Sequence, residues 1–166
     1  MALLEDGRLG ATYPVSTSKF GVGDIPGSKG TPLGDLEIAS KIGAGAPSGA
    51  VFKDRRRTGE VVRPGAPGRD PIVSRILWLR GLEPQNARAF SRYIYIHGTP
   101  EERNIGLPAS YGCVRMCSRD VIQLFDLVGT GARVTIAGAP LETLVPNLTP
   151  AAQAVAAGEM EKLDTR

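Results

Sequence analysis

The sequence predicts a mainly β domain, and three features of the chain support that prediction. Its 21 glycines and 13 prolines are spread along 166 residues, so they punctuate many short segments instead of gathering in one linker. Several of these segments are rich in β-branched and aromatic residues, and Tyr93–His97 alternates regularly in side-chain type. A chain of this length can form one hydrophobic core without disulfides or metals, so a single domain is expected.

A β-hairpin is expected at the start of the chain. The turn Glu5-Asp6-Gly7 would join a short stub, Met1 to Leu4, to a strand from Arg8 to Val15. A second hairpin or a solvated loop is expected around the basic cluster Lys53 to Arg57, which is interrupted by Asp54 and contains no aromatic residue. This cluster is therefore not interpreted as a binding patch.

Three further strands are expected in the middle of the chain. Leu36 and Ile38 alternate with Glu37 after a turn at Thr31 to Gly34, and Ile72 to Leu79 supplies β-branched and aromatic residues. The clearest strand is Tyr93–His97, in which two isoleucines would face the core and His97 would lie on the opposite face beside two tyrosines. That opposite face is predicted to form the wall of a cleft.

The hydrophobic period changes to that of a helix at Ser118. Apolar residues from there onward fall on one stripe of a three-turn helix: Val121, Ile122, Phe125 and Val128. Ser118 is the expected N-cap, Asp120 suits the first turn, and Gly129 suits the C-terminal stop. A final strand is expected at Arg133 to Ile136, and an Ala-rich tail helix from Thr149-Pro150 to about Leu163.

The composition excludes several classes of function. A net charge of +3, from 20 basic and 17 acidic residues, is mild and spread along the chain, so no nucleic acid partner is indicated. No segment is long and apolar enough to cross a bilayer. The first ten residues carry Glu5, Asp6 and Arg8 where a secretory peptide would be apolar, so no export signal is visible.

His97 and Cys113 are the candidate catalytic residues. His97 is the sole histidine, so it is the one side chain whose ordinary pKa suits a general base near neutral pH. Cys113 follows a glycine, which allows a tight turn in which amides can converge on an oxyanion. Taken singly, a lone histidine or a free cysteine is more often a packed structural residue. A neighbouring imidazole is what would activate the thiol.

The second cysteine, Cys117, has no preceding glycine and is interpreted as a packing residue. Cys113 and Cys117 are too close in sequence and too few for a disulfide framework. One histidine and two cysteines would barely supply three zinc ligands, so no metal and no other cofactor is expected.

Two motifs give the chain a resemblance to a known family. His97-Gly98-Thr99 follows the predicted strand, and Ser110-Tyr111-Gly112-Cys113-Val114-Arg115-Met116 comes later in the chain. In this order and context they resemble the signature of the L,D-transpeptidase catalytic domain, also called the YkuD domain. The resemblance runs from about Leu3 to Ile136 and leads us to expect a catalytic domain at residues 1–138. The tail, residues 139–166, is expected to be helical and part of the same structural unit.

The resemblance implies a β-sandwich with a short helix after the cysteine, and an enzyme that acts on peptidoglycan stem peptides. Cys113 would be acylated by a tetrapeptide at meso-diaminopimelate with release of D-Ala, and an amine of another stem would then form a 3→3 cross-link. Water in place of that amine would make the chain an L,D-carboxypeptidase, and a non-catalytic wall-binding module is the alternative of another class. The substrate implies a location in the cell envelope, with an export signal absent from this sequence.

The resemblance also implies roles for individual residues. Cys113 would be the nucleophile and His97 the base, with Gly98 offering its carbonyl to orient the imidazole. The oxyanion site would comprise Tyr111 and Gly112 with the amide of Cys113. Substrate binding or loop bracing is expected of the three remaining site residues: Ser110, Tyr95 and Arg115. For Arg115, bracing through main-chain oxygens is favoured over binding of a substrate carboxylate. Tyr111 stands where the family more commonly has histidine.

Overall fold

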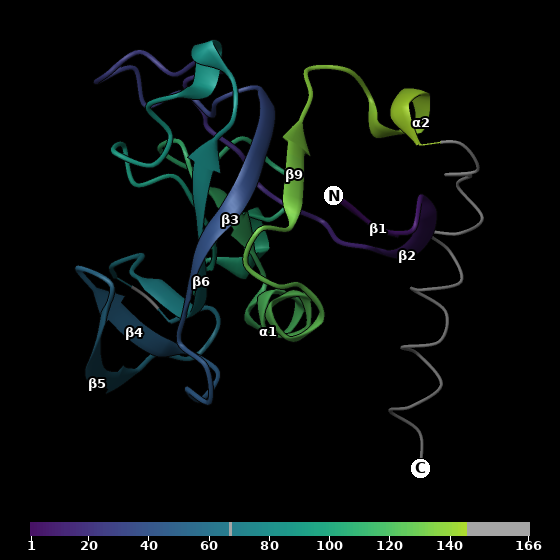
Figure 1. Ribbon diagram of the computed structural model, residues 1–166. Coiled ribbons are helices and arrows are strands. Elements are labelled where there is room, and N and C mark those ends of the chain that lie inside the picture. The colour runs from purple at the N-terminus through teal and green to yellow at the C-terminus, as the bar shows by residue number, and fades with distance from the viewer. Residues whose placement is uncertain (67, 146–166) are drawn as a thin grey trace. The chain divides into compact units, whose positions relative to one another are not determined.

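The computed structural model describes residues 1–66 and 68–145, which form two compact units (Figure 1). The larger unit is Pro14–Gly138, and Met1–Tyr13 groups with the segment that starts at Ala139. The mainly β prediction is confirmed, since the described residues form nine strands but only two α-helices and two 3₁₀-helices. The assignment of residues 1–138 and the tail to one structural unit stays a prediction.

The smaller unit contains the predicted N-terminal hairpin, with β1 at Ala2–Glu5 and β2 at Arg8–Thr12 paired antiparallel. Asp6 and Gly7 take left-handed conformations in the turn, with φ of 49° and 76°. The second strand ends at Thr12, before the predicted end at Val15. A short helix, α2 at Leu141–Leu144, lies in the tail that was expected to be helical and begins before the predicted start at Thr149. The predicted tail helix lies outside the described residues.

The larger unit is built on a seven-stranded sheet that branches at a long central strand, β6 (Ile72–Gly81). One end of β6 pairs with the hairpin of β4 (Ala50–Lys53) and β5 (Arg56–Val61), and the other end pairs with β3 (Gly34–Ile42). The outer neighbour of β3 is β9 (Arg133–Ile136). The predicted strands at residues 36–38, 72–79 and 133–136 are thus confirmed, and the first two extend further than predicted.

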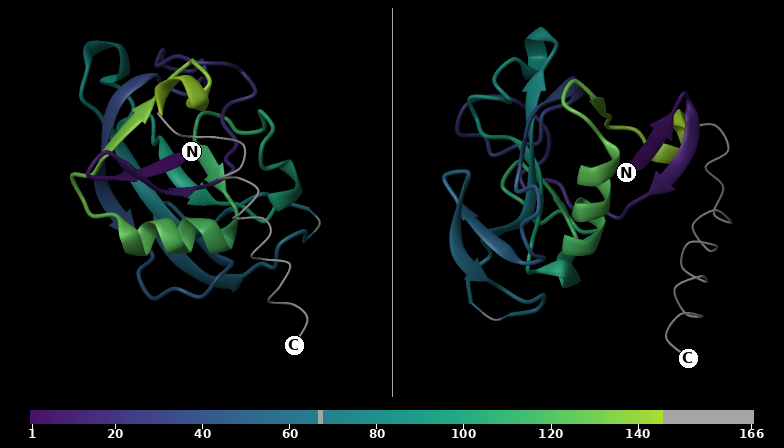
Figure 2. Two further views of the ribbon diagram at one scale, coloured as in Figure 1. Left: turned by 90° about the vertical axis from the view of Figure 1, so that its right-hand side faces the viewer. Right: turned by 60° about the horizontal axis from the view of Figure 1, so that its bottom comes forward.

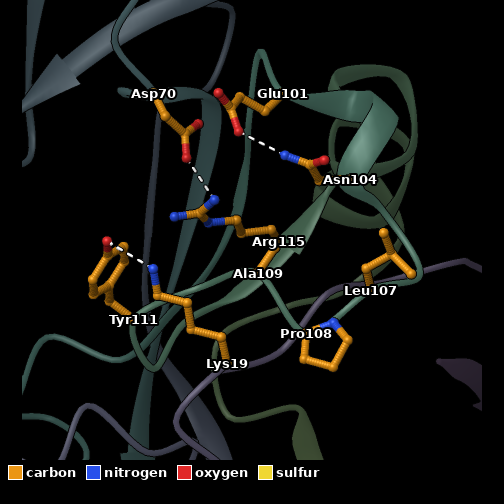
Figure 3. Close-up of a pocket in the computed structure, with 9 residues that line it drawn as sticks. All are labelled: Lys19, Asp70, Glu101, Asn104, Leu107, Pro108, Ala109, Tyr111 and Arg115. Atoms are coloured by element: carbon orange, nitrogen blue, oxygen red, sulfur yellow. Dashed lines mark hydrogen bonds and ion pairs between the residues drawn. The ribbon is translucent and has the colours of Figure 1, made fainter.

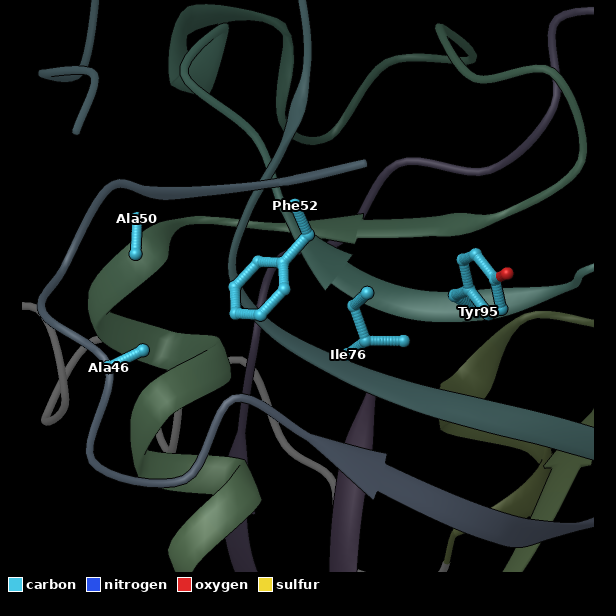
Figure 4. Packing of buried hydrophobic residues seen from close by; sticks show 5 residues of the cluster. All are labelled: Ala46, Ala50, Phe52, Ile76 and Tyr95. Atoms are coloured by element: carbon cyan, nitrogen blue, oxygen red, sulfur yellow. The ribbon is translucent and has the colours of Figure 1, made fainter. Parts of the chain in front are cut away.

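The basic cluster Lys53 to Arg57 forms a hairpin, which is one of the two structures expected for it; the other was a solvated loop. Asp54 and Arg55 lie in the turn between β4 and β5 with φ of 50° and 64°, the left-handed geometry of a two-residue hairpin loop. The inner side of this hairpin contributes to a cluster of buried apolar side chains (Figure 4), which comprises Ala46, Ala50, Phe52, Ile76 and Tyr95. Cys113 and Trp78 pack against this cluster. The hairpin therefore contributes Ala50 and Phe52 to the cluster against which Cys113 packs.

The candidate base lies on the other edge of β6, where β7 (Tyr95–Gly98) pairs antiparallel with it and β8 (Val114–Met116) pairs parallel with β7. The predicted strand began at Tyr93, but Tyr93 has a φ of 58° and lies outside the strand. Ile94 and Ile96 are buried as expected. Tyr95 and His97 are buried as well, so both faces of β7 are covered, and the cleft wall on this face stays a prediction.

The predicted helix after the cysteine is present as α1 (Ser118–Leu127), which contacts β6 and β7 (Figure 2). Val121 and Phe125 are buried on its inner face, together with Leu124. The expectation that Ser118 is the N-cap is wrong, because the cap is Cys117 and its side chain makes no capping bond. Instead, the N–H of Ser118 donates to the carboxylate of Glu102 at 2.7 Å.

Candidate active site

The register of the two parallel strands brings the predicted catalytic motifs together. His97 pairs with Arg115 and Ile96 pairs with Val114, so Cys113 comes beside Tyr95 at the start of β8. The contact of Tyr95 N–H with Cys113 Sγ at 3.4 Å agrees with that placement. Two motifs that are separated in sequence are therefore neighbours across one strand pair.

The thiol of Cys113 is held between two main-chain groups. It accepts a hydrogen bond from Tyr95 N–H and donates one to the carbonyl oxygen of Tyr93, each at 3.4 Å. Burial raises the pKa of this thiol to about 11, although the Tyr95 amide opposes the shift. The thiol is consequently protonated at neutral pH in the ligand-free protein.

The acceptor of that thiol proton is a residue with an unusual backbone. Tyr93 is half exposed and adopts a left-handed conformation, φ 58°, which is uncommon for an aromatic residue. Such conformations cost roughly 1–3 kcal/mol and persist where the surrounding structure enforces them. Here the conformation accompanies a carbonyl turned toward Cys113.

The imidazole of His97 is buried and oriented by the next residue in the chain. Its Nδ1 lies 2.8 Å from the carbonyl oxygen of Gly98. Because a carbonyl only accepts, Nδ1 carries the proton and Nε2 has the free lone pair that a general base needs. Burial lowers the pKa of His97 to about 4, with Gly98 opposing and Arg115 adding to the shift. The imidazole is therefore neutral at neutral pH.

Gly98 has a packing reason to be glycine. A Cβ at this position would lie 2.6 Å from the carbonyl oxygen of Val73 and 3.2 Å from Val121. The absence of a side chain thus lets β7 pass closely between β6 and α1, immediately after the histidine. The same close passage contributes to the burial of His97.

The burial of His97 predicts a pH dependence of stability. The unfolded chain binds a proton at His97 below about pH 6.5, whereas the folded chain does so only below about pH 4. Between these values the unfolded state binds more protons, so the free energy of unfolding falls as the pH falls, by an amount on the order of 3 kcal/mol. Urea unfolding of the native protein and His97→Gln at pH 4.5 and pH 7 checks this. Equal pH dependence in both proteins would show that another group is responsible.

The two candidate catalytic side chains do not hydrogen-bond to each other. In the described part of the chain, Cys113 Sγ bonds to main-chain groups of Tyr93 and Tyr95, and the His97 ring bonds to the carbonyl of Gly98. Catalytic hydrogen bonds are often loose in ligand-free enzymes and tighten when substrate binds. Both side chains are neutral in this resting arrangement, because burial lowers the pKa of His97 and raises that of Cys113.

Ser110 and Thr31 hold the turn that carries Cys113. Buried Ser110 donates from Oγ to the carbonyl of Cys113 at 2.6 Å and accepts from the N–H of Gly112 at 3.2 Å. Buried Thr31 donates to the carbonyl of Gly112 at 3.0 Å. Gly112 has a φ of +125°, which disfavours any other residue. The turn is thus fixed on both sides of Cys113.

Two main-chain amides near the thiol remain open to a ligand. The N–H of Gly112, one of the predicted oxyanion donors, is taken by Ser110. Those of Tyr111 and Cys113 make no hydrogen bond within residues 1–66 and 68–145. Of the three predicted donors, Tyr111 and Cys113 therefore stay candidates for binding an oxyanion, and Gly112 contributes the conformation of the turn.

Arg115 forms an ion pair in place of the expected main-chain contacts. Its Nη1 lies 2.5 Å from Oδ2 of Asp70, whose Oδ1 accepts from Thr99 Oγ1 at 2.5 Å. Asp70 thereby connects β8 to the residue that follows the His-Gly pair. This carboxylate, rather than the main chain, is what Arg115 braces.

The two remaining predicted site residues differ in exposure. Tyr95 is buried, and its hydroxyl oxygen accepts from Arg55 at 3.4 Å, so its side chain supports the cluster below Cys113. Tyr111 is half exposed, and its hydroxyl accepts a hydrogen bond from Lys19 at 3.0 Å. That bond lowers the pKa of the Tyr111 hydroxyl. Of the two, Tyr111 is the one accessible to a ligand.

Sequence reasoning missed the residues that support the site from other segments. Thr31 and Asp70 are distant in sequence from both motifs, and Arg92 binds Asp24 at 2.7 Å and the carbonyl of Gly30 at 2.8 Å. Arg92 directly precedes Tyr93, but nothing in a single sequence indicates which loop it would hold. Such contacts depend on tertiary structure, which local patterns do not encode.

No cluster of three or more His, Cys, Asp or Glu side chains is arranged to hold a metal ion among residues 1–66 and 68–145. Within the same residues, none of the helices has the length and apolarity needed to cross a membrane.

Comparison with known proteins decides the family. The model of the L,D-transpeptidase catalytic domain, YkuD, matches residues 1–136. The chain belongs to this family. The strand-end His-Gly-Thr and the cysteine turn described above thus lie in an L,D-transpeptidase catalytic domain, and the Cys–His candidates fall within the matched region.

Individual relatives agree with membership of the L,D-transpeptidase family. YqjB of Bacillus subtilis, named as an L,D-transpeptidase, is 28% identical over 137 residues, or 82% of this chain and 64% of YqjB. YkuD of Bacillus subtilis is 51% identical over 41 residues, a quarter of each chain. The L,D-transpeptidase of Xylanimonas cellulosilytica, residues 123–326, shares the fold with a TM-score of 0.50 and 20% identity, covering 82% of this chain and 54% of that structure. The chain therefore spans a quarter to about two-thirds of the length of these relatives.

Proposed function

We propose that this chain is a peptidoglycan L,D-transpeptidase in which Cys113 is the nucleophile and His97 the general base. The observation that carries the proposal is the pairing of β7 with β8, which sets the turn of Cys113 beside the strand of His97. Within the part of the chain that the structure describes, Nε2 of His97 and the amides of Tyr111 and Cys113 have no partner, and they supply the other two functions that acyl transfer needs. Membership of the family supplies the substrate class.

In the first step, Cys113 Sγ attacks the carbonyl carbon of the L-centre of meso-diaminopimelate in a stem tetrapeptide. The thiol proton passes to Nε2 of His97 as the carbon–sulfur bond forms, and the oxyanion accepts from the amides of Tyr111 and Cys113. The bond between that carbonyl carbon and the nitrogen of D-Ala then breaks, and the proton on Nε2 goes to the departing amine. The product is a thioester on Cys113.

In the second step, the amine of another stem attacks the thioester carbonyl. His97 accepts a proton from that amine, the carbon–sulfur bond breaks, and the proton returns to the sulfur of Cys113. The result is a 3→3 cross-link and a regenerated thiol. Gly98 keeps Nδ1 protonated throughout, which leaves Nε2 as the atom that exchanges protons. Because the substrate is peptidoglycan, the proposed place of action is the cell envelope.

Product analysis tests the proposed reaction. Purified protein is incubated with a disaccharide tetrapeptide, with and without an acceptor stem, and the products are analysed by mass spectrometry. We expect cross-linked dimer and free D-Ala in the presence of acceptor. Hydrolysed tripeptide alone under both conditions would identify an L,D-carboxypeptidase, and binding to peptidoglycan without any product would identify a wall-binding module. Either result would overturn transpeptidation.

A further inference from the structure

A pocket of about 420 Å³ lies next to the cysteine turn and contains side chains of both charges (Figure 3). Tyr111 and Arg115, which lie two residues before and after Cys113, form part of its lining. The pocket is lined by Lys19, Asp70, Glu101, Asn104, Leu107, Pro108, Ala109, Tyr111 and Arg115. Its position beside the nucleophile makes it a candidate for binding the part of a substrate nearest the reacting carbonyl.

The acidic and basic side chains of this pocket occupy different positions along it. In Figure 3 the carboxylates of Asp70 and Glu101 lie at one end, Lys19 and Tyr111 lie at the other, and Arg115 lies between. Leu107 and Pro108 form an apolar side. A ligand that fits such a lining carries both an ammonium and a carboxylate, on a short apolar chain.

Several of these charged groups have capacity left for a ligand. Lys19 donates to the Tyr111 hydroxyl at 3.0 Å, which occupies one of its three N–H groups. Oε2 of Glu101 accepts from Asn104 at 2.7 Å, whereas among residues 1–66 and 68–145 the partner of Oε1 is an exposed arginine, Arg103, at 4.0 Å. Asp70 is different, because both of its oxygens are taken by Arg115 and Thr99. Among the described residues of this lining, Lys19 thus keeps donor capacity and Glu101 keeps acceptor capacity, and the buried Nε of Arg115 also lacks a hydrogen-bond partner.

We propose that this pocket binds the zwitterionic side-chain end of the third residue of the donor stem, with Lys19 on its carboxylate and Glu101 on its ammonium. The inference rests on the proposed function and adds the residues that select the donor. In meso-diaminopimelate, three methylene groups separate the reacting centre from a carbon that carries one ammonium and one carboxylate. The methylenes lie along Leu107 and Pro108, while the carbonyl of the reacting centre lies at Cys113.

Three donor tetrapeptides test the contributions of the ammonium and the carboxylate one at a time. The first carries unmodified meso-diaminopimelate, the second has its side-chain carboxyl amidated, and the third has its side-chain amine acetylated. Acylation is followed as D-Ala release without any acceptor stem, so that only the donor is present. For the native protein we expect kcat/KM to fall about tenfold with either modification, as is typical when a charged hydrogen-bonding partner is lost.

Two variants assign each preference to one residue. Lys19→Met is expected to abolish the preference for the free carboxyl and keep that for the free amine, whereas Glu101→Gln does the reverse. Lys53→Met and Glu5→Gln, which change exposed residues outside the pocket, are expected to keep both preferences. Thermal unfolding of each variant establishes that it is folded.

The outcomes distinguish a failure of the pocket assignment from a failure of the proposed reaction. Acylation of native protein without either preference, or variants that keep both preferences at native values, would overturn the pocket assignment alone. A preference that arises only when the modified residue is on an acceptor stem would overturn the assignment to the donor. Failure to acylate with all three donors would refute the proposed function and the pocket assignment with it.

Discussion

Cys113→Ser is expected to lower the rate of D-Ala release from a stem tetrapeptide by about 10³-fold or more. A serine hydroxyl is far less acidic than a thiol, and the neutral imidazole of His97, with a pKa of about 4, is a weak base for removing its proton. The contacts of Sγ with Tyr93 and Tyr95 can be retained by Oγ, so the fold should persist. Steady-state kinetics and circular dichroism check both expectations.

Cys117→Ser is the matched control for that change. Cys117 is half-buried at the N-cap of α1, and burial also raises the pKa of its thiol to about 11. The pKa therefore does not separate the two cysteines, but their positions do, because Cys113 lies beside β7. The control should keep activity within about twofold. Loss of activity in Cys117→Ser with retention in Cys113→Ser would assign the nucleophile to Cys117.

His97→Gln is expected to lower kcat by about 10²- to 10⁴-fold, because the base that accepts the thiol proton is removed. Glutamine is the chosen replacement since its amide can still donate to the carbonyl of Gly98. The change therefore tests proton transfer rather than the packing of β7. KM should change little by comparison, as the imidazole is buried.

The pH dependence of kcat/KM gives an independent test of His97 as the base. A base must be deprotonated to act, and burial lowers the pKa of His97 to about 4, so kcat/KM of the native protein should decline only as the pH falls toward 4. In His97→Gln, the residual activity should lack that acidic decline. An unchanged rate and profile in the variant would exclude His97 as the base.

Much of the fold was predictable because the patterns that specify it are local. The alternation at Ile94 and Ile96, the apolar stripe of α1 and the turn at Asp6-Gly7 each gave an element of the correct type. Errors arose where tertiary contacts override local preference. Tyr93 lies outside the predicted strand, and the N-cap of α1 is Cys117, while the N–H of Ser118 donates to the carboxylate of Glu102.

The residues of the candidate site also differ in whether a local motif or a tertiary contact determines them. His97, Gly98 and Cys113 were identifiable because two short motifs contain them, and the structure places these motifs side by side. The partner of Arg115 was not predictable, since Asp70 lies 45 positions earlier in the sequence (115 − 70 = 45) and belongs to no motif. The occupied amide of Gly112 was also beyond sequence reasoning, because it depends on the orientation of the Ser110 hydroxyl.

The central claim is that a stem peptide acylates Cys113, and intact-protein mass spectrometry of the protein with a disaccharide tetrapeptide tests it most directly. We expect an adduct with the mass of the substrate minus D-Ala, mapped by peptide digestion to the segment that contains Cys113, and absent from Cys113→Ala. D-Ala release with the adduct on Cys117, or release that persists undiminished in Cys113→Ala, would contradict the account.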